Sequence, residues 1–332
     1  VDSRPPAMPT GLLVESLDNR LRLTWAANQE TDMGGYEIQA SNTAISGYAP
    51  VGTVESPSFI LDSLRNFAIL HLKVRAVEQA GNQGPFSAPF SAAALPEPGI
   101  DRVSESPQML GGELNGELRL SKALSPYTVR SNLIIGPSGK LYIEPGVTVL
   151  FAPGTAIMAS QGAILAYGQL DQPIRFAPLS DSAGPGTYTG LILDQASQAV
   201  LQFVHIDRAA TGVRISSSAP EMIGLDISRS SQAALHLMDQ AEPSLSCSRL
   251  HNNQGMGALV VEGMGPSPDF HANVFSANAP FHVQNFSPMT LNMSRNHWGP
   301  NGPRIDQFLG GVLLEPVLPA SPLDTGECAT LP

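Results

Sequence analysis

Apolar residues recur along the second half of the chain with a period of twenty to twenty-five positions. Between residues 199 and 299 each repeat contains short alternating runs joined by polar turns, and the apolar positions align in columns. The aligned sets are Leu201, Met222, Leu245 and Phe270; Ile206, Ile227, Leu250 and Phe275; and Val213/Ile215, Leu235/Leu237, Leu259/Val261 and Phe281/Val283. One such unit cannot bury its own apolar side, so the pattern predicts a stacked solenoid of roughly eight coils.

The stretch before these repeats, residues 127–178, carries short apolar runs that end at glycine and proline corners. Such runs are typical of parallel strands wound into a helix, because the inward side of each strand is buried. The runs are 141–143, 147–151, 163–167 and 174–176. The stretch therefore predicts the same architecture as the repeats that follow it.

The first 97 residues alternate apolar and polar positions over short segments, which predicts half-buried strands. The segments are 21–25, 36–41, 58–61 and 70–77, and turn-forming residues occupy 28–35 and 79–85. About seven short strands in this length favour a β-sandwich. We therefore expect an all-β chain. Its parts are a sandwich at 1–97, a linker at 98–112, a parallel β-helix at 113–320 and a tail at 321–332.

Composition limits the kinds of partner. The 332 residues carry a net charge of −11, only 14% are charged, and of the 18 basic residues just three are lysines. A nucleic-acid partner needs clustered Lys and Arg, so this class is excluded. No apolar run reaches about 18 residues, so no membrane-spanning segment is expected. The chain starts at Val1 without a signal peptide, and its lysine-poor, β-rich composition indicates the mature or trimmed form of an exported protein.

The two cysteines leave two interpretations open. Cys247 stands at an inward position of a column, where a small buried thiol is expected. Cys328 lies four residues from the end, and a Cys247–Cys328 disulfide would tether the tail. The chain has no Cys-x-x-Cys or other zinc spacing and no carboxylate cluster that would support Ca²⁺. No metal or other cofactor is therefore predicted.

Residues 5–95 resemble a fibronectin type III domain. The resemblance rests on the segment 9–25 with Trp25, on 32–41 with Tyr36, and on 72–92. It implies that Trp25 and Tyr36 are core residues of the sandwich. The tyrosine-corner position of the family is Leu72 here, so that corner must be held by packing. No Arg-Gly-Asp tripeptide is present, so integrin-type adhesion has no support.

Residues 113–320 resemble secreted bacterial right-handed parallel β-helix proteins of the pectin-lyase-like kind. The resemblance rests on the Ser-Pro-Tyr strand at 125–127, the segment 143–151, the Asn-x-Trp-Gly motif at 296–299 and the closing strand 311–319. It implies the fold but not the function, because this family includes enzymes, adhesins and scaffold proteins. Trp298 and Gly299 are expected to cap the open end of the coil stack. A tryptophan that stacks on sugar is the alternative for Trp298.

Outward side chains of successive coils stand about 4.8 Å apart in a β-helix and form ladders. The first polar ladder contains His205, Asp226 and Arg249, continues to Val274 and Arg295, and runs beside a second line of residues. That line is Gln202, Ile223, Ser246, His271 and Asn292. A carboxylate between two basic groups suits a polysaccharide lyase or epimerase, which needs a base and cations beside the substrate carboxylate. The alternative is a surface ion-pair ladder of little energetic value.

A second outward ladder is mixed in character. Its positions are Arg214, His236, Val260 and His282, with Ser216, Met238, Glu262 and Gln284 two residues further on. His236 with Glu262 or with Asp239 is a candidate acid–base pair, and the candidate ligand-binding residues of this face are Arg214, His236, Asp239, Glu262 and His282. Val260 interrupts the histidines, which favours a solvated polar face instead.

A third column aligns five polar residues. They are Asp207, Ser228, His251, Ser276 and His297. Its two histidines are two coils apart, about 9.6 Å, which is too far to share a metal ion. Polygalacturonase-like hydrolysis needs converging aspartates, whereas the aspartates here are scattered over coils and turns.

These patterns favour a non-catalytic scaffold over an enzyme. We expect an exported bacterial protein, extracellular, on the cell surface or in the periplasm, that binds a glycan or a cell-envelope protein through a face of the β-helix. The sandwich would serve as spacer, end cap or docking module. One alternative is a polysaccharide lyase or epimerase acting on an acidic glycan through the first ladder. Another is a subunit of a large surface or periplasmic assembly.

Overall fold

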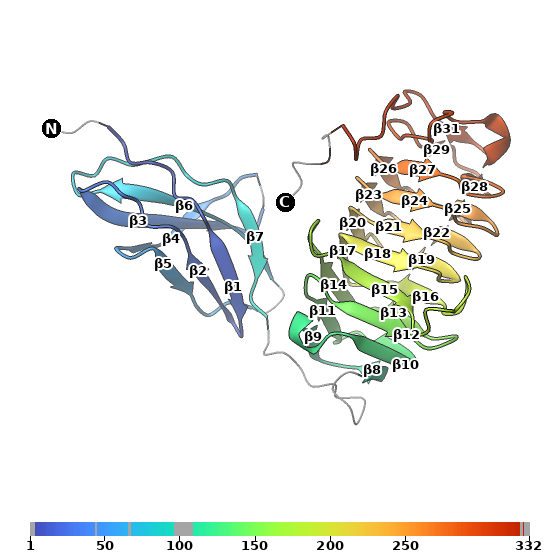
Figure 1. Cartoon of the computed structure of the whole chain (residues 1–332), viewed down its shortest axis with the longest axis horizontal. Helices are drawn as coiled ribbons and strands as arrows, with labels where there is room; N and C mark the ends of the chain where they lie inside the picture. Colours follow the sequence, from blue (N-terminus) through green and yellow to red (C-terminus); the bar gives the residue numbers. More distant parts are fainter. Residues whose placement is uncertain (1–3, 44, 66–67, 96–108, 326–327, 329–332) are drawn as a thin grey trace. The chain divides into compact units, whose positions relative to one another are not determined.

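The computed structural model describes residues 4–43, 45–65, 68–95, 109–325 and 328. The chain divides into two compact units, one ending at Glu97 and one beginning at Pro98. Strands dominate both units (Figure 1). Regular helix in the described residues amounts to two short 3₁₀ turns, η1 (Lys122–Leu124) and η2 (Ile305–Gln307). The predicted all-β class is confirmed.

The first unit is a sandwich of two antiparallel sheets, drawn blue to cyan in Figure 1. One sheet has the order β1-β2-β5, formed by β1 (Leu13–Leu17), β2 (Arg20–Thr24) and β5 (Ser58–Leu61). The other has the order β4-β3-β6-β7, formed by β3 (Met33–Ser41), β4 (Ala49–Val54), β6 (Ile69–Glu78) and β7 (Phe90–Ala93). All four segments predicted as strands lie on β2, β3, β5 and β6.

The core of this sandwich contains the two predicted aromatic residues. Trp25 and Tyr36 are 6% and 4% exposed, and their rings meet edge to face at 5.1 Å between centroids. The phenol oxygen of Tyr36 also accepts the backbone N–H of Asn28 at 2.9 Å, which ties a loop to the core. Leu72 is fully buried. Apolar packing therefore fills the place where the family has its tyrosine.

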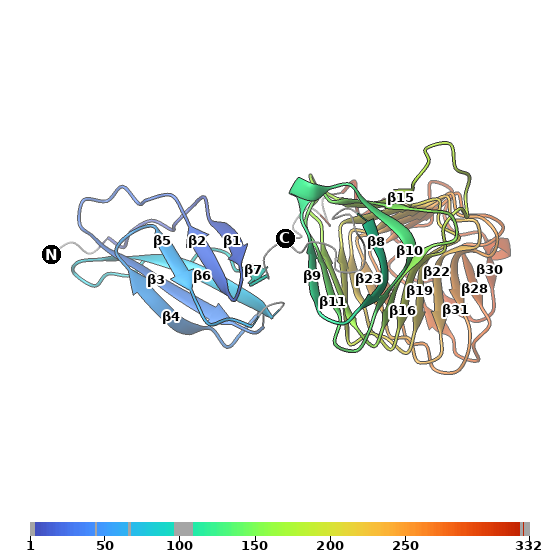
Figure 2. The ribbon, with the colours of Figure 1, turned by 90° about the horizontal axis from the view of Figure 1, so that it is seen from below.

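The second unit is a β-solenoid of about nine turns, one more than the coil count predicted from the repeats. Each complete coil contributes one strand to each of three parallel stacks (Figures 1 and 2). Stack 1 contains β12 (Thr148–Phe151), β15 (Ile174–Pro178), β18 (Val204–Asp207), β21 (Asp226–Ser228), β24 (Arg249–His251) and β27 (Val274–Ser276). Stack 2 contains β13 (Ala156–Ser160), β16 (Gly190–Asp194), β19 (Thr211–Ser216), β22 (Ala233–Met238), β25 (Gly257–Val261), β28 (Val283–Asn285) and β30 (Phe308–Leu309).

Stack 3 and the bridging strands complete the solenoid. Stack 3 contains β9 (Glu117–Leu120), β11 (Lys140–Ile143), β14 (Ala163–Tyr167), β17 (Gln198–Gln202), β20 (Glu221–Ile223), β23 (Ser244–Ser246) and β26 (Asp269–His271). The long β10 (Tyr127–Ile135) pairs with β12 and with β13, so it joins stacks 1 and 2. At the far end β29 (Leu291–Asn292) pairs with β31 (Val312–Leu313).

The strand register confirms the inward columns read from the sequence. Leu201, Met222, Leu245 and Phe270 are paired in succession in stack 3. Ile206, Ile227, Leu250 and Phe275 are paired in succession in stack 1. All eight are at most 2% exposed and belong to one continuous core. The repeat therefore reflects the stacking that buries it.

The predicted alignment of the third inward column, which contains Leu259, is wrong at the last coil. Leu259 pairs with Val283 rather than with Phe281, and Val260 pairs with Gln284 rather than with His282. The error is a shift of two residues, which keeps inward residues inward because side chains alternate with a period of two. The hydrophobic pattern alone therefore cannot distinguish the two registers.

The structure shows where the solenoid begins and how its last coils are packed. The predicted linker, 98–112, extends too far, because β8 (Met109–Leu114) already pairs with β10 as part of the first coil. The rest of that linker lies outside the described residues. At the other end Trp298 stacks on Phe275 at 4.7 Å and is 2% exposed, so no sugar can stack on its ring. Gly299 follows with φ of +75°, a conformation that suits glycine.

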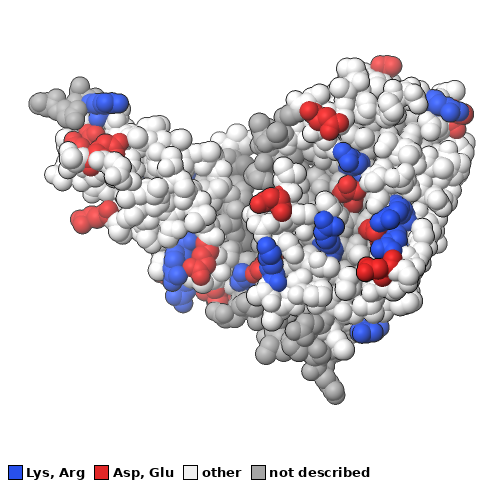
Figure 3. Space-filling model, in the orientation of Figure 1, with Lys and Arg blue, Asp and Glu red and all other residues white. Residues whose placement is uncertain are grey.

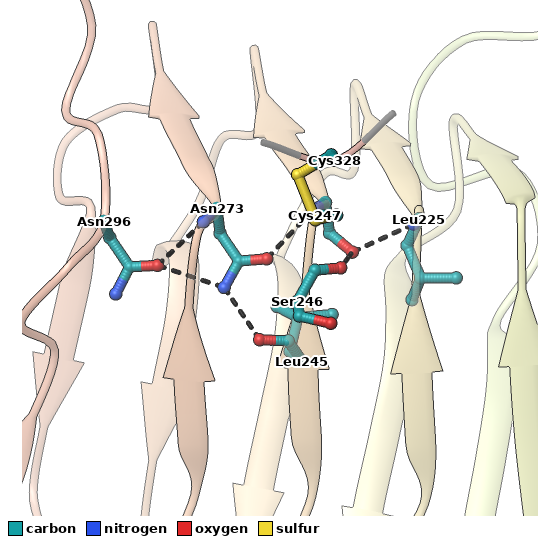
Figure 4. Close-up of a disulfide and its surroundings, with 8 residues drawn as sticks. Leu225, Leu245, Ser246, Cys247, Asn273, Asn296 and Cys328 are labelled. Atoms are coloured by element: carbon teal, nitrogen blue, oxygen red, sulfur yellow. Dashed lines mark hydrogen bonds between the residues drawn. A yellow bond between two sulfur atoms is a disulfide. The ribbon is translucent and has the colours of Figure 1, made fainter. Parts of the chain in front are cut away.

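A disulfide joins the tail to the solenoid (Figure 4). Cys247, at the corner between β23 and β24, is bonded to Cys328 with their Cα atoms 5.6 Å apart. The interpretation of Cys247 as a free buried thiol is therefore wrong. Cys247 lies in a left-handed corner conformation with φ of 51°, outside the regular alternation of the strands, and its side chain is 8% exposed. Just before the tail, Leu318 donates its backbone N–H to the carbonyl of Asn296 at 3.1 Å. Residues 326–327 and 329–332 of the predicted tail lie outside the described residues.

Near this disulfide in the sequence, Ser248 begins a ladder of buried polar side chains that continues with Asn273 and Asn296, and we call it the corner ladder. Figure 4 shows Asn273 and Asn296 beside the disulfide. Asn273 accepts the N–H of Ser248 at 3.0 Å, and Asn296 accepts the N–H of Asn273 at 3.0 Å. Asn273 also donates from Nδ2 to the Leu245 carbonyl at 2.9 Å. Because the backbone turns away from its sheet at the corner, these side chains provide the partners that a strand would supply.

Candidate functional site

The first predicted ladder lies on the outward face of stack 1. The register pairs His205 with Asp226 and Asp226 with Arg249. It also adds Arg175 of β15, one rung before His205, which the sequence columns did not include because they began at residue 199. The predicted alignment is present, and the catalytic role of these residues stays a prediction.

The third predicted column forms the neighbouring row of stack 1. Asp207, Ser228, His251 and Ser276 are paired in succession. His297 is not in this row, because it pairs with Val274 in the row of Asp226. It thereby occupies the place predicted for Arg295. This is again a shift of two residues near the end of the solenoid.

Asp226 is linked across the two rows. Its Oδ1 lies 2.9 Å from Nε2 of His251, while Asn252 Nδ2 lies 2.7 Å from Nδ1 of the same ring. Since the Asn252 amide nitrogen can only donate, Nδ1 of His251 accepts and Nε2–H donates to Asp226. Burial would raise the pKa of Asp226, but the hydrogen bond from His251 and the nearby Arg249 guanidinium help to bring it below its usual value.

The surroundings of His205 favour its neutral form over its charged form. Burial lowers the pKa of His205, Asp226 opposes this shift, and the charge of Arg175 adds to it. A neutral imidazole beside an ionised carboxylate is able to accept a proton or to hydrogen-bond a ligand hydroxyl. The arrangement of these two residues therefore suits both ligand binding and acid–base chemistry.

Asp207 holds two arginines at the edge of the same rows. Arg208 donates from Nε to Oδ2 at 2.9 Å. Arg229 donates from Nε to Oδ1 at 2.7 Å and from Nη2 to Oδ2 at 2.6 Å. The columns of the sequence did not single out either arginine, because both lie at corners with positive φ, 60° and 55°. The only sequence signal for them is that Arg208 directly follows Asp207, and Arg229 directly follows Ser228, in the third predicted column.

Together these residues surround a shallow hollow of about 250 Å³. Its lining consists of Arg175, His205, Ile206, Asp207, Asp226, Ser228, Arg229 and His251. Arg175 and Arg229 line the hollow, and Arg208 and Arg249 lie beside it. These four arginines come from four successive coils, those of β15, β18, β21 and β24. Figure 3 shows basic and acidic side chains interspersed over this face of the solenoid. Such an arginine concentration on a chain of net charge −11 favours an anionic ligand.

The second predicted ladder, on stack 2, is only partly assembled. Arg214 pairs with His236, and Nε2 of His236 lies 3.2 Å from Oε2 of Glu262, although not in hydrogen-bonding geometry. Asp239 instead accepts the hydroxyl of Ser216 at 3.0 Å. Val260 is fully buried and separates His236 from the end of the ladder.

His282 does not belong to that ladder. It is 2% exposed, its Nδ1 lies 3.2 Å from Nδ2 of Asn278, and it packs on the rings of Trp298 and Phe308. Burial among these uncharged groups lowers the pKa of His282 from 6.5 to about 4. A ligand-binding role for His282 is therefore wrong for this structure, since the ring is in the core.

Acidification is expected to destabilise the solenoid through His282. Because its folded-state pKa is below 6.5, the unfolded chain binds the proton first, and stability falls as the pH drops below 6.5. By about pH 5 the loss should be about 2 kcal/mol relative to neutral pH. Urea unfolding of the parent and of His282→Gln at both pH values measures this. An equal pH dependence in the two proteins would contradict it.

Metal and membrane features give no further candidates in the described part of the chain. No group of three or more His, Cys, Asp or Glu side chains there is placed to hold a metal ion. No helix among the same residues is long and apolar enough to cross a membrane.

No protein-family model and no curated protein matches this chain. Solved structures do match. The FN1–FN3 domains of chicken CNTN1 are 25% identical, with 27% of this chain and 32% of that chain covered and a TM-score of 0.25. A human fibronectin type III domain is 22% identical, covering 28% of this chain and 77% of its own, with a TM-score of 0.25.

An Fn3-like protein from Clostridium thermocellum is 24% identical, covering 28% of this chain and 96% of its own, with a TM-score of 0.24. The first unit is a fibronectin type III-like β-sandwich. Its two antiparallel sheets, the orders β1-β2-β5 and β4-β3-β6-β7, and the buried Trp25 and Tyr36 agree with the resemblance read from the sequence.

Proposed function

We propose that this chain is the binding scaffold of an exported bacterial protein and that stack 1 of its solenoid binds an acidic glycan. A fibronectin type III-like unit joined to a β-solenoid fits a structural or binding scaffold. The observation that carries the glycan proposal is the hollow lined by Arg175 and Arg229, with Arg208 and Arg249 on the two other coils beside it. The Cys247–Cys328 disulfide supports an oxidising, exported location.

The spacing of the arginines suits an extended polymer. Arg175 of β15 and Arg249 of β24 are three rungs apart, about 14 Å along the solenoid. Among the described residues neither guanidinium has an acidic partner within 4.0 Å, so both are available to ligand carboxylates. A glycan lying along the stack would meet these two cations with the hollow between them.

Replacing Arg175 or Arg249 with glutamine should weaken binding of polygalacturonate about fivefold to tenfold each. The reason is the loss of one charge-assisted contact at a site that solvent reaches. Calorimetric titration of the full chain measures it, and added salt should weaken the parent's binding further. Arg130→Gln, at an exposed position of β10, is the matched control and should change nothing. Unchanged affinity in both stack 1 variants would overturn the proposal.

His205 favours a second candidate, a polysaccharide lyase or epimerase. What supports this candidate is the pairing of His205 with Arg175, because an imidazole in its neutral form suits removal of a proton next to a carboxylate that an arginine neutralises. Ultraviolet absorbance of unsaturated products from alginate or pectin tests the lyase. If the parent forms unsaturated products and His205→Ala does not, the protein is an enzyme and the scaffold proposal is wrong. If the parent forms no such products, the lyase candidate is rejected and the binding proposal stands.

A further inference from the structure

Asp207 is paired with two arginines, although one would neutralise its charge. Arg208 already neutralises Asp207, and its side chain is 15% exposed. Arg229 adds a second guanidinium to the same carboxylate, and its side chain is 56% exposed. Exposed ion pairs contribute little to stability, so the second arginine has little structural reason to be there. It leaves a net charge of about +1 at the rim of the hollow.

The geometry of Arg229 leaves part of its guanidinium unused. Its Nε and Nη2 form the two bonds to Asp207, so the Nη1 end points away from that carboxylate. A guanidinium has five N–H donors in a fixed fork, and one already held in place loses little conformational entropy when a ligand binds. Arg229 is therefore oriented in advance for a second anion.

A loop holds Arg208, the other arginine that is paired with Asp207. The segment 179–187 lies between β15 and β16 and projects from the solenoid (Figure 2). Arg208 donates from Nη1 to the carbonyls of Asp181 and Ala183 at 2.7 and 2.9 Å. The Arg208 carbonyl accepts the N–H of Gly186 at 3.0 Å. The loop thus holds Arg208, and Arg208 holds the carboxylate that orients Arg229.

We propose that Arg229 is a specificity-determining residue that hydrogen-bonds a carboxylate of the bound glycan, with Asp207 and Arg208 as its positioning residues. This inference rests on the proposed glycan binding. It adds that the ligand is recognised by a guanidinium fixed by loop 179–187, and not by the summed positive charge of the face alone. Carboxylate and guanidinium are geometrically matched for paired hydrogen bonds.

Removing the Asp207 charge distinguishes recognition by a positioned Arg229 from attraction by the summed positive charge of the face. Asp207→Asn makes the hollow more positive, so charge alone would strengthen binding of polygalacturonate. Positioning predicts the opposite, a loss of about threefold to tenfold, because Arg229 is released from its fixed orientation. Arg229→Gln should lose about tenfold, and Arg229→Lys should regain little because lysine lacks the fork.

The measurement is calorimetric titration of the full chain with polygalacturonate. Dextran sulfate is titrated as an anionic polymer without carboxylates, and neutral dextran as an uncharged polymer. The Arg304–Asp306 pair offers a matched control, since Arg304 also donates from Nε and Nη2 to an exposed aspartate. Arg304→Gln and Asp306→Asn should bind as the parent does. Tryptophan fluorescence melting checks that each variant is folded, and Arg229→Lys serves if Asp207→Asn fails that check.

The outcomes separate this inference from the function on which it rests. If the parent binds neither polygalacturonate nor dextran sulfate, both proposals fall. If the parent binds polygalacturonate but Arg229→Gln binds equally well, or Asp207→Asn binds more tightly, only the role of Arg229 and its positioning residues is overturned. Equal affinity of the parent for dextran sulfate would also reject carboxylate recognition.

Discussion

Replacing both Cys247 and Cys328 with alanine is expected to lower the free energy of unfolding of the solenoid by about 4 kcal/mol. The two residues are 81 positions apart, so the disulfide closes a long loop in the unfolded chain and reduces its conformational entropy. The loop contains all of the strands from β24 to β31. Without the cross-link, the terminal coils lose the constraint that keeps them near β23.

Urea unfolding measures this loss if the two units are observed separately. The chain has two tryptophans, Trp25 in the sandwich and Trp298 in the last coils. In a Trp25→Phe background the remaining fluorescence reports Trp298 and therefore the solenoid. The reduced parent should unfold at the same urea concentration as the double-alanine variant. Coincident unfolding of the oxidised parent and the variant would show that the disulfide leaves solenoid stability unchanged.

The fold could be predicted from the sequence wherever burial repeats with each coil. Columns such as Ile206, Ile227 and Leu250 were aligned correctly because a shift of one residue would turn every apolar side chain outward. Near the end of the solenoid the prediction fails by two residues at Val283 and at His297. A shift of two preserves the alternation, so only the hydrogen-bonded register distinguishes the alternatives.

The candidate site could be predicted only as far as it lies on strands. Asp226 and Arg249 follow the alternation of their strands and were aligned from it. Arg208 and Arg229 lie at left-handed corners, where the chain leaves one stack for the next and alternation no longer applies. The hydrogen bond of Asp226 to His251 runs diagonally between two rows, and a column of aligned residues does not encode diagonal contacts. The site is therefore assembled by corners and diagonals as much as by ladders.

The corner ladder explains why buried polar residues persist in a core of otherwise apolar columns, and it yields the second large expected effect. Asn273→Ala should lower the free energy of unfolding by about 3 kcal/mol. The substitution leaves the N–H of Ser248 and the carbonyl of Leu245 without their side-chain partner in a fully buried corner. Buried groups that lose such partners contribute the largest destabilisations among single polar substitutions.

The same Trp298 fluorescence assay tests this expectation, and the chain offers a matched control. Asn292 is exposed, and its Oδ1 accepts only the nearby N–H of Ser294 at 3.1 Å among the hydrogen bonds described. Asn292→Ala should therefore cost no more than about 0.5 kcal/mol. Asn273→Asp should be nearly as damaging as alanine, because it keeps the acceptor for Ser248 but brings a charge into the core and removes the donor to Leu245. Similar stabilities for the alanine variants at 273 and 292 would mean that the corner is held by the backbone and the disulfide, and not by the side-chain ladder.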